Sequence, residues 1–198
     1  MAKVKTHIMY KLKIISSTVR PGRKGPVIAK WIAEAAKQHG NFEVELLDLG
    51  EINLPVMNEA IHPIMKQYEH EHSKHWSAKI EEADAFIFVT AEYDYSYPAS
   101  LKNAIEYLVH EWAYKAAGMV SYSIGPFAGV RAVMSLKADL LSLKVIGLAE
   151  AVNIPSYNQF INEEGDFVAN ELIEKSTTVM LNQLVRWTKG MKAIKEDK

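Results

Sequence analysis

Short segments rich in β-branched and aromatic residues alternate with amphipathic segments along this chain. The strongest of them is the run 83–90 (ADAFIFVT), whose composition is typical of a strand in the middle of a sheet. Further strands are expected at 12–16, 42–47, 118–123 and 148–152. Parallel neighbouring strands need crossovers, which helices supply. The alternation therefore predicts a three-layer α/β domain around a parallel sheet of about five strands.

The helices of this domain can be placed from their end signals and from the spacing of apolar residues. Pro26 suits the start and Gly40 the end of the first helix, and Pro98 suits the first turn of a later one. A long crossover, 51–82, ends in a helix rich in His and Glu. Two further helices are expected to bury these stripes: Val130, Val133, Met134 and Leu141 in one, and Leu172, Ile173, Met180, Leu184 and Trp187 in the C-terminal one. A charged, frayed tail is expected over 189–198.

Length and composition restrict the classes of protein that this chain can belong to. Its 198 residues suit a single domain, 1–198, with a core over about 11–190. The formal net charge of -1 offers no bulk field for nucleic acid or anionic lipid, so neither is expected as a partner. The lack of cysteine excludes disulfides, thiolate nucleophiles and cysteine-ligated metals. No apolar run approaches the length of a membrane helix, and 1–10 lacks the core of a secretory signal, so we expect a cytoplasmic protein.

The loop after the first predicted strand has the composition of an anion site. In an open parallel sheet, ligands bind beyond the carboxyl ends of the strands, where the strand order reverses. The loop 17–24 (STVRPGRK) places hydroxyl groups, two guanidinium groups and an ammonium group directly before a helix. Free backbone N–H groups and the helix dipole favour an anion there. The loop contains neither GxGxxG nor GxxxxGK[ST], which disfavours ATP-driven chemistry.

The loops after the third and fourth predicted strands suit a flat ligand. The loop 92–98 (EYDYSYP) carries three tyrosines, which provide flat apolar faces with one polar group each. The loop 121–129 (SYSIGPFAG) combines small residues with an aromatic residue, and small residues let a planar ligand approach the backbone. Taken singly, each loop could also be a solvated turn or a packing contact.

Three segments together identify a family. The segments STVRPGR (17–23), AEYDYSYPASLKNAIEYL (91–108) and SYSIGPFAGVRA (121–132) resemble, in order and spacing, the signature loops of the NAD(P)H-dependent FMN reductases, which include quinone and azo-dye reductases. The resemblance extends from Leu12 to about Pro155. It implies a flavodoxin-like doubly wound fold with a five-stranded parallel sheet in the order 2-1-3-4-5.

The resemblance also implies a role for each of the three loops. Thr18, Arg20 and Arg23, with the backbone from Ser17, would hold the FMN phosphate. The residues lining the isoalloxazine, mostly through backbone groups, would be Glu92, Tyr93, Asp94 and Tyr95. The residues bordering the other side of the ring and the ribityl chain would be Ser121, Tyr122 and Ser123.

Three positions depart from the family pattern. Ser17 and Ser123 stand where glycine is usual, and Asp94 stands where asparagine is usual. We expect backbone strain at Ser17, since its Cβ enters a tight turn. At Asp94, a carboxylate would disfavour the anionic reduced flavin.

The function implied is a hydride transfer from NADPH or NADH, through non-covalently bound FMN, to a quinone, an azo compound, free flavin or a similar small acceptor. The chemistry belongs to the cofactor, so no catalytic side chain and no metal ligand are assigned. The family also implies a homodimer or homotetramer. Two alternatives remain open: a flavin-binding carrier or sensor without turnover, and a binding module of the same fold without flavin.

Two other kinds of site are disfavoured by the sequence. The histidines of the crossover could bind a metal, but no third ligand is evident, and a solvated helix explains them more simply: His62, His70, His72 and His75. A Ser-His-Asp hydrolase is disfavoured because no GxSxG elbow follows a predicted strand.

Overall fold

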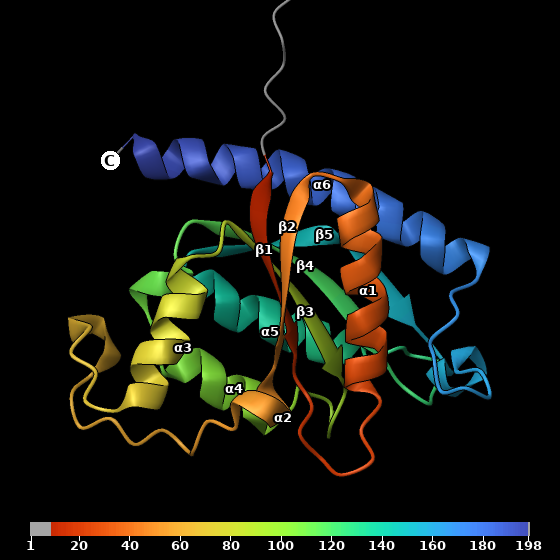
Figure 1. Cartoon of the computed structure of the whole chain (residues 1–198), viewed down its shortest axis with the longest axis horizontal. Coiled ribbons are helices and arrows are strands. Elements are labelled where there is room, and N and C mark those ends of the chain that lie inside the picture. Colours follow the sequence, from red (N-terminus) through yellow and green to blue (C-terminus); the bar gives the residue numbers. More distant parts are fainter. Residues whose placement is uncertain (1–8, 198) are drawn as a thin grey trace, which may run out of the picture.

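The computed structural model describes residues 9–197, and a parallel sheet forms its centre (Figure 1). The five strands lie in the order β2-β1-β3-β4-β5, and each adjacent pair is parallel. Their bounds are Tyr10–Ser16 for β1, Phe42–Asp48 for β2, Ala85–Ala91 for β3, Lys115–Tyr122 for β4 and Val145–Ile154 for β5. The predicted fold class and strand order are confirmed.

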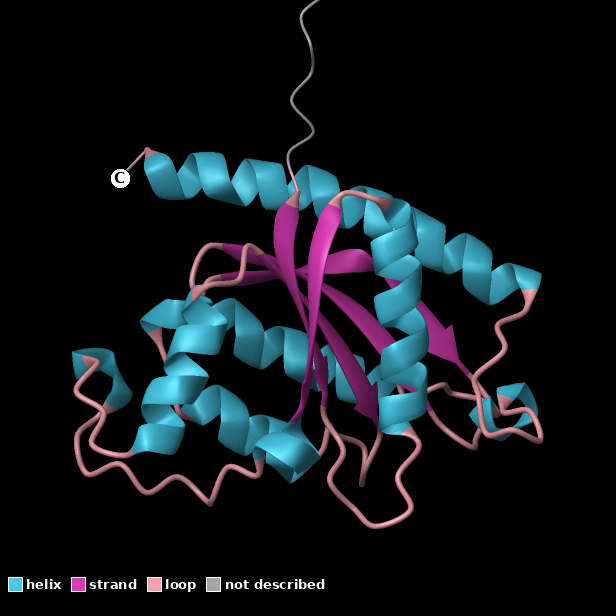
Figure 2. Cartoon of the chain, in the orientation of Figure 1, coloured by secondary structure: helices cyan, strands magenta, loops and turns pink. Residues whose placement is uncertain are grey.

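Helices cover both faces of the sheet and complete the three layers (Figure 2). The α-helices are α1 (Gly25–His39), α2 (Leu49–Ile52), α3 (Glu71–Glu81), α4 (Ala99–Glu106), α5 (Val130–Ser142) and α6 (Glu171–Glu196). Three short 3₁₀ helices accompany them: η1 (Pro63–Met65), η2 (His110–Trp112) and η3 (Tyr157–Phe160). One hydrophobic core joins α1 and α6 to the sheet, and a second core joins α3, α4 and α5 to its other face.

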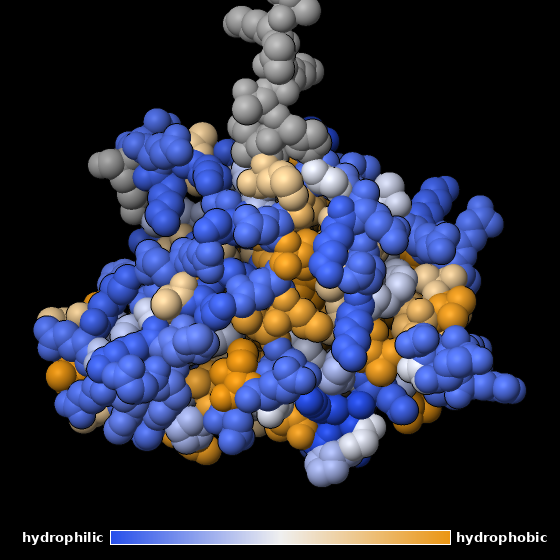
Figure 3. All heavy atoms as spheres, in the orientation of Figure 1, coloured by the Kyte–Doolittle hydropathy of each residue, from blue (hydrophilic) through white to orange (hydrophobic). Residues whose placement is uncertain are grey.

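The central strand of the fold is β3, in which every residue is buried. Trp76 and Trp112 pack in the core that joins α3, α4 and α5 to the sheet, with their ring centroids 6.1 Å apart. On the face shown in Figure 3 the surface is largely hydrophilic. In the view of Figure 3, apolar atoms show mainly between α1 and α3, where the edge strand β2 lies.

The strand order fixes where a ligand can bind. The chain passes from β1 outward to β2 and then returns to β3 on the other side of β1, so the order reverses between β1 and β3. The carboxyl ends of the strands are aligned by register, with Ser16 opposite Val89 and Ala91 opposite Tyr122. The loops that follow β1, β3 and β4 therefore leave the sheet at one edge.

The prediction of which residues of α5 face the core is wrong: the buried face is rotated by part of a turn from the predicted one. Val130, Met134 and Leu141 are 42%, 63% and 64% exposed. The residues that pack on the sheet are Ala132, Val133, Leu136 and Leu140. Both sets repeat at helical spacing, so periodicity alone could not choose between them.

The C-terminal prediction also needs correction. Leu172 and Trp187 lie on the surface, whereas Ile173, Met180 and Leu184 are buried as expected. The tail expected to fray is helical, because α6 continues to Glu196 and Met191 anchors its last turns in the core. The first eight residues of the predicted N-terminal tail lie outside the described residues.

Two further observations concern the whole described chain. Among the helices of residues 9–197, none is both long and apolar enough to cross a membrane. Within the same residues, no three His, Asp or Glu side chains are grouped so that they could hold a metal ion. In the crossover, His70 and His72 stack on each other with ring centroids 5.1 Å apart, and both bond to oxygens of Asn58.

Candidate flavin site

The loop between β1 and α1 forms the first wall of the candidate site. Ser17 and Thr18 are buried where β1 ends, and the chain then turns outward through exposed residues before α1 begins. Lys24, the N-cap of α1, makes no side-chain capping hydrogen bond. Pro26 has no N–H, and the N–H groups of Val27 and Ile28 donate to the carbonyl of Lys24, so within residues 9–197 the N–H of Gly25 is the one in this turn left for a ligand. This N–H group and the positive end of the helix dipole lie at the same edge of the sheet as the loop, and they favour an anion.

The loop after β3 forms the second wall. Its residues 93–96 close a tight turn in which Tyr93 and Ser96 exchange two backbone hydrogen bonds of 2.8 and 2.9 Å. Asp94 and Tyr95, the central residues, have positive φ angles of 46° and 67°. This turn places the ring of Tyr93, 37% exposed, on the cavity side.

The loop after β4 forms the third wall. Tyr122 is buried, and its hydroxyl lies 3.3 Å from the hydroxyl of Thr18 in the first loop. Burial raises the pKa of Tyr122 above its ordinary value, so this phenol stays protonated at neutral pH. Beyond it, the hydroxyl of Ser123 donates to the carbonyl of Gly125 and holds the loop in a compact form.

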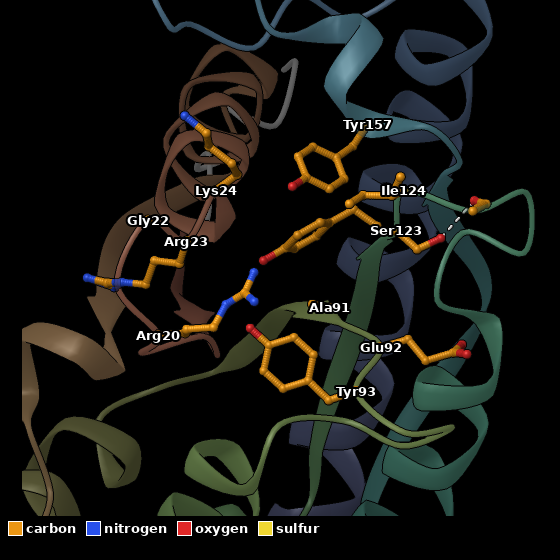
Figure 4. Close-up of a pocket in the computed structure, with 12 residues that line it drawn as sticks. Arg20, Gly22, Arg23, Lys24, Ala91, Glu92, Tyr93, Ser123, Ile124 and Tyr157 are labelled. Atoms are coloured by element: carbon orange, nitrogen blue, oxygen red, sulfur yellow. Dashed lines mark hydrogen bonds between the residues drawn. The ribbon is translucent and has the colours of Figure 1, made fainter.

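The three loops enclose a cavity of about 300 Å³ at the carboxyl edge of the sheet (Figure 4). Its lining contains six of the eleven predicted residues: Arg20, Arg23, Glu92, Tyr93, Tyr122 and Ser123. It also contains residues that were not predicted: Gly22, Lys24, Ala91, Ile124, Gly125 and Tyr157. Loops far apart in the sequence therefore meet at one place.

The two arginines of the first loop have different surroundings. The guanidinium of Arg23 donates to both carboxylate oxygens of Asp48, at 3.0 Å each, and to the carbonyl of Thr18. Within residues 9–197, Arg20 has no such carboxylate partner, and its guanidinium carbon lies 6.0 Å from the ring centroid of Tyr93. Figure 4 shows the side chain of Arg20 reaching in among the cavity side chains, while that of Arg23 points away. Arg20 is thus the guanidinium available to an anion.

Direct contacts hold the walls together. The hydroxyl of Ser100 donates to the carbonyl of Ser17 and ties the first loop to α4. Arg131, in the first turn of α5, forms an ion pair with Glu92 and so ties the second wall to the third. The backbone N–H of Tyr157 donates to the carbonyl of Ser123 at 3.2 Å and ties in the segment after β5. The segments around the cavity are therefore linked to one another and to α4.

Two observations fit this site to a phosphorylated flavin. The hydroxyl oxygen of Ser17 is buried and has no hydrogen-bond partner among the described residues, which is unusual for a polar atom unless a ligand completes it. A Cβ at Gly25 would lie 2.4 Å from Thr18 Oγ1 and 2.8 Å from the Tyr122 hydroxyl, so only glycine lets the helix start this close to both loops. A buried donor, a free helix N-terminus and an unpaired arginine are the groups that hold a phosphate.

The other five predicted residues lie outside the cavity lining. Ser17 and Thr18 lie just behind the first wall, and Ser121 is buried and donates to Asn153 Oδ1 at 2.8 Å. Asp94 and Tyr95 lie at the exposed tip of the second loop, where Tyr95 is 69% exposed. Neither of these two side chains lines the cavity.

The strain expected at Ser17 is absent. Positive φ angles occur at eight non-glycine residues of the described chain, and neither Ser17 nor Ser123 is one of them. The backbone at these positions lies where any residue fits, so a serine in place of glycine needs no distortion. The prediction of strain is therefore wrong.

Tyr157 is the main residue that sequence reasoning missed. It comes from η3, three residues after β5, and its ring packs edge-on to Tyr122 at 5.2 Å. The rule that ligands bind beyond the carboxyl ends of strands would have indicated this segment too, had it been applied to the last strand.

Comparison with known proteins gives consistent results. Residues 10–159 match the family model described as NADPH-dependent FMN reductase. An NAD(P)H-dependent FMN reductase of Schizosaccharomyces pombe is 40% identical over 149 residues, covering 73% of this chain and 74% of the relative. An NADPH azoreductase of a Bacillus species is 30% identical over 131 residues, covering 66% of this chain and 68% of the relative. Among solved structures, the flavoenzyme FerB, an NAD(P)H:(acceptor) oxidoreductase from Paracoccus denitrificans, superposes with a TM-score of 0.76 at 23% identity, covering 92% of this chain and 99% of its own.

Proposed function

Because the chain belongs to the NADPH-dependent FMN reductase family, we propose that its cavity binds FMN and serves the transfer of a hydride from NADPH or NADH to a small electron acceptor. The predicted family, enzyme class and cofactor are confirmed by the family match. The single observation that carries the proposal is the meeting of the loops after β1, β3 and β4 around one cavity.

The first loop holds the phosphate in this proposal. Arg20 supplies a guanidinium that no carboxylate of residues 9–197 pairs with, and the start of α1 supplies the N–H of Gly25. The hydroxyl of Ser17 is a buried donor that lacks a partner. Arg23 acts indirectly, because its pairing with Asp48 fixes the loop.

The second and third walls hold the ring. Ala91 and Tyr93 line one side of the cavity, and Tyr122 and Ile124 line another. When bound there, FMN would supply the hydride chemistry between the nicotinamide and an acceptor, so these residues need only position the ring and leave one face accessible. We infer a quinone, an azo compound or free flavin as acceptor, since these planar molecules can stack on an exposed ring.

We further propose that the protein works in the cytoplasm, where NAD(P)H is supplied, as a homodimer or homotetramer. Support for assembly comes from apolar side chains of the loops after β3 and β4 and of α5 that are each more than 60% exposed: Tyr95, Ile124, Phe127 and Met134. Exposed apolar surface of this kind commonly marks subunit contacts. Light scattering on the purified protein would measure the oligomer size.

Anaerobic spectroscopy tests the proposed function. Purified protein loaded with FMN should lose its flavin absorbance when NADPH or NADH is added and regain it when a quinone follows. Flavin that stays oxidised with both nucleotides would favour the carrier or sensor alternative. Protein that takes up no FMN in a fluorescence titration would favour the binding module and overturn the proposal.

A further inference from the structure

The turn at residues 93–96 carries an unusual residue. A two-residue turn with positive φ at both central positions is normally built from Asn, Asp or Gly. Here the second central position is Tyr95, with a φ of 67°. Left-handed backbone is unfavourable for an aromatic residue because its Cβ approaches the following carbonyl. The turn therefore needs stabilisation from outside itself.

Burial does not supply that stabilisation. Tyr95 is 69% exposed and lies outside the cavity lining. Its ring instead stacks on the guanidinium of Arg131, whose carbon lies 3.9 Å from the ring centroid. A planar cation in this position is attracted by the face of the ring. Arg131 thus stabilises Tyr95, whose backbone conformation is the least favourable in the turn.

Arg131 makes three other contacts at the same place. Its guanidinium forms an ion pair with Glu92, whose side chain is only 9% exposed, and its backbone N–H donates to Glu92 at 3.3 Å. The guanidinium carbon also lies 5.1 Å from the ring centroid of Phe127, in the loop after β4. Arg131 therefore joins Glu92, directly before the turn, and Tyr95, within it, to the neighbouring wall.

We propose that Arg131 is a positioning residue for the flavin: by stacking on Tyr95 and pairing with Glu92, it fixes the turn whose other side forms a wall of the cavity. The inference rests on the proposed function, because the ligand that the wall positions is FMN. Arg131 itself does not line the cavity. Glu92, which directly precedes the turn, and Tyr93, its first residue, both do. Its effect on the flavin is transmitted through the shape of the turn.

Two substitutions of Arg131 separate its two contacts. Arg131→Lys keeps a positive charge for Glu92 but loses the planar group that stacks on Tyr95, and we expect FMN to bind about threefold more weakly. Arg131→Gln loses both contacts, and we expect a loss of about tenfold. The amide of Ser96, which bonds to the carbonyl of Tyr93, should exchange its hydrogen faster by similar factors in the flavin-free protein.

A third substitution tests whether the effect passes through the strained turn. Glycine adopts positive φ readily, so Tyr95→Gly removes the strain and the stacked ring together. In that background Arg131→Lys should change FMN affinity by less than about twofold.

The visible circular dichroism of bound flavin should change in Arg131→Gln, since it reports the surroundings of the ring.

The chain offers a matched control at the opposite end of the sheet. Lys144 lies 5.4 Å from the ring centroid of Tyr114, which also has a positive φ, of 61°. Lys144→Met removes a cation from a left-handed tyrosine far from the cavity. It should alter neither FMN affinity nor the flavin dichroism.

The outcomes are distinguishable. Unchanged Ser96 exchange in Arg131→Gln would overturn the inference, as would faster exchange with unaltered FMN affinity, or an undiminished effect of Arg131→Lys in the Tyr95→Gly background. Wild-type protein that takes up no FMN would overturn the proposed function and with it the flavin role of Arg131. Ser96 exchange, measured without flavin, would still show whether Arg131 holds the turn.

Discussion

Removing Arg20 should affect ligand binding and removing Arg23 should affect stability, although the two residues lie three positions apart in the same loop. Arg20 reaches into the cavity and pairs with no carboxylate of the part of the chain that the structure describes, whereas Arg23 is held by Asp48. Arg20→Ala should therefore weaken the binding of FMN and leave the fold intact. Arg23→Ala should destabilise the fold.

The size of the Arg20 effect follows from the chemistry of its expected contact. A charge-assisted hydrogen bond contributes about 1.5–3 kcal/mol, which is roughly a 10- to 150-fold change in the dissociation constant of FMN. Riboflavin lacks the phosphate, so its affinity should change by less than about twofold. The ratio of the two losses isolates the phosphate contact from any general disturbance of the cavity.

The size of the Arg23 effect follows from burial. Asp48 is only 6% exposed, and removing Arg23 leaves its carboxylate without the ion pair, while the backbone N–H of Gly50 remains as a donor. Because the Arg23 side chain is 19% exposed, we expect a loss of about 2–3 kcal/mol, below the full cost of breaking a buried pair. For a chain of this size that lowers the melting temperature by about 5–10 °C.

Fluorescence titrations with FMN and with riboflavin, together with thermal unfolding followed by circular dichroism, measure both effects. Arg186→Ala, on the exposed surface of α6, is the control for loss of one positive charge. Equal losses for FMN and riboflavin in Arg20→Ala would refute the phosphate contact. An unchanged melting temperature in Arg23→Ala would refute the anchoring role of that residue.

Two further predictions concern the fold around the site. Gly25→Ala should destabilise the protein by about 1–3 kcal/mol, because its Cβ would meet Thr18 Oγ1 at 2.4 Å. The control is Gly190→Ala, which has open space around it and should not destabilise the protein. In thermal unfolding, a larger loss of stability for Gly190→Ala than for Gly25→Ala would contradict this account. Burial lowers the pKa of Lys115 to about 7, so between about pH 7 and 10 the unfolded chain binds more protons than the folded one. Stability to urea should therefore rise with pH over this range in the wild type and rise less in Lys115→Met; parallel pH profiles would show that Lys115 is charged in the fold.

The elements that position the site could be predicted because they depend on local signals. The run 83–90 is apolar throughout its centre, and Gly40 ends α1 with a φ of 81°, as a helix-ending glycine should. The convergence of three loops followed from strand order, since parallel strands present their carboxyl ends at one edge.

What the sequence could not provide depends on contacts between distant residues. Arg20 and Arg23 look equivalent in the sequence, and only Asp48, 25 positions after Arg23, distinguishes them. The exposed and buried stripes of α5 have the same period, so the choice between Met134 and Leu136 depended on where the sheet lies. Arg131 is far from Tyr95 and Glu92 in the sequence and contacts them only in the folded structure, so no local sequence pattern predicts these contacts.

A crystal structure of the protein with bound FMN would test the central claim most directly. We predict electron density for the phosphate beside Arg20, Ser17 and the first turn of α1, with the isoalloxazine between the loops that follow β3 and β4. Density for FMN elsewhere on the molecule, or a phosphate that avoids the first loop, would contradict the account.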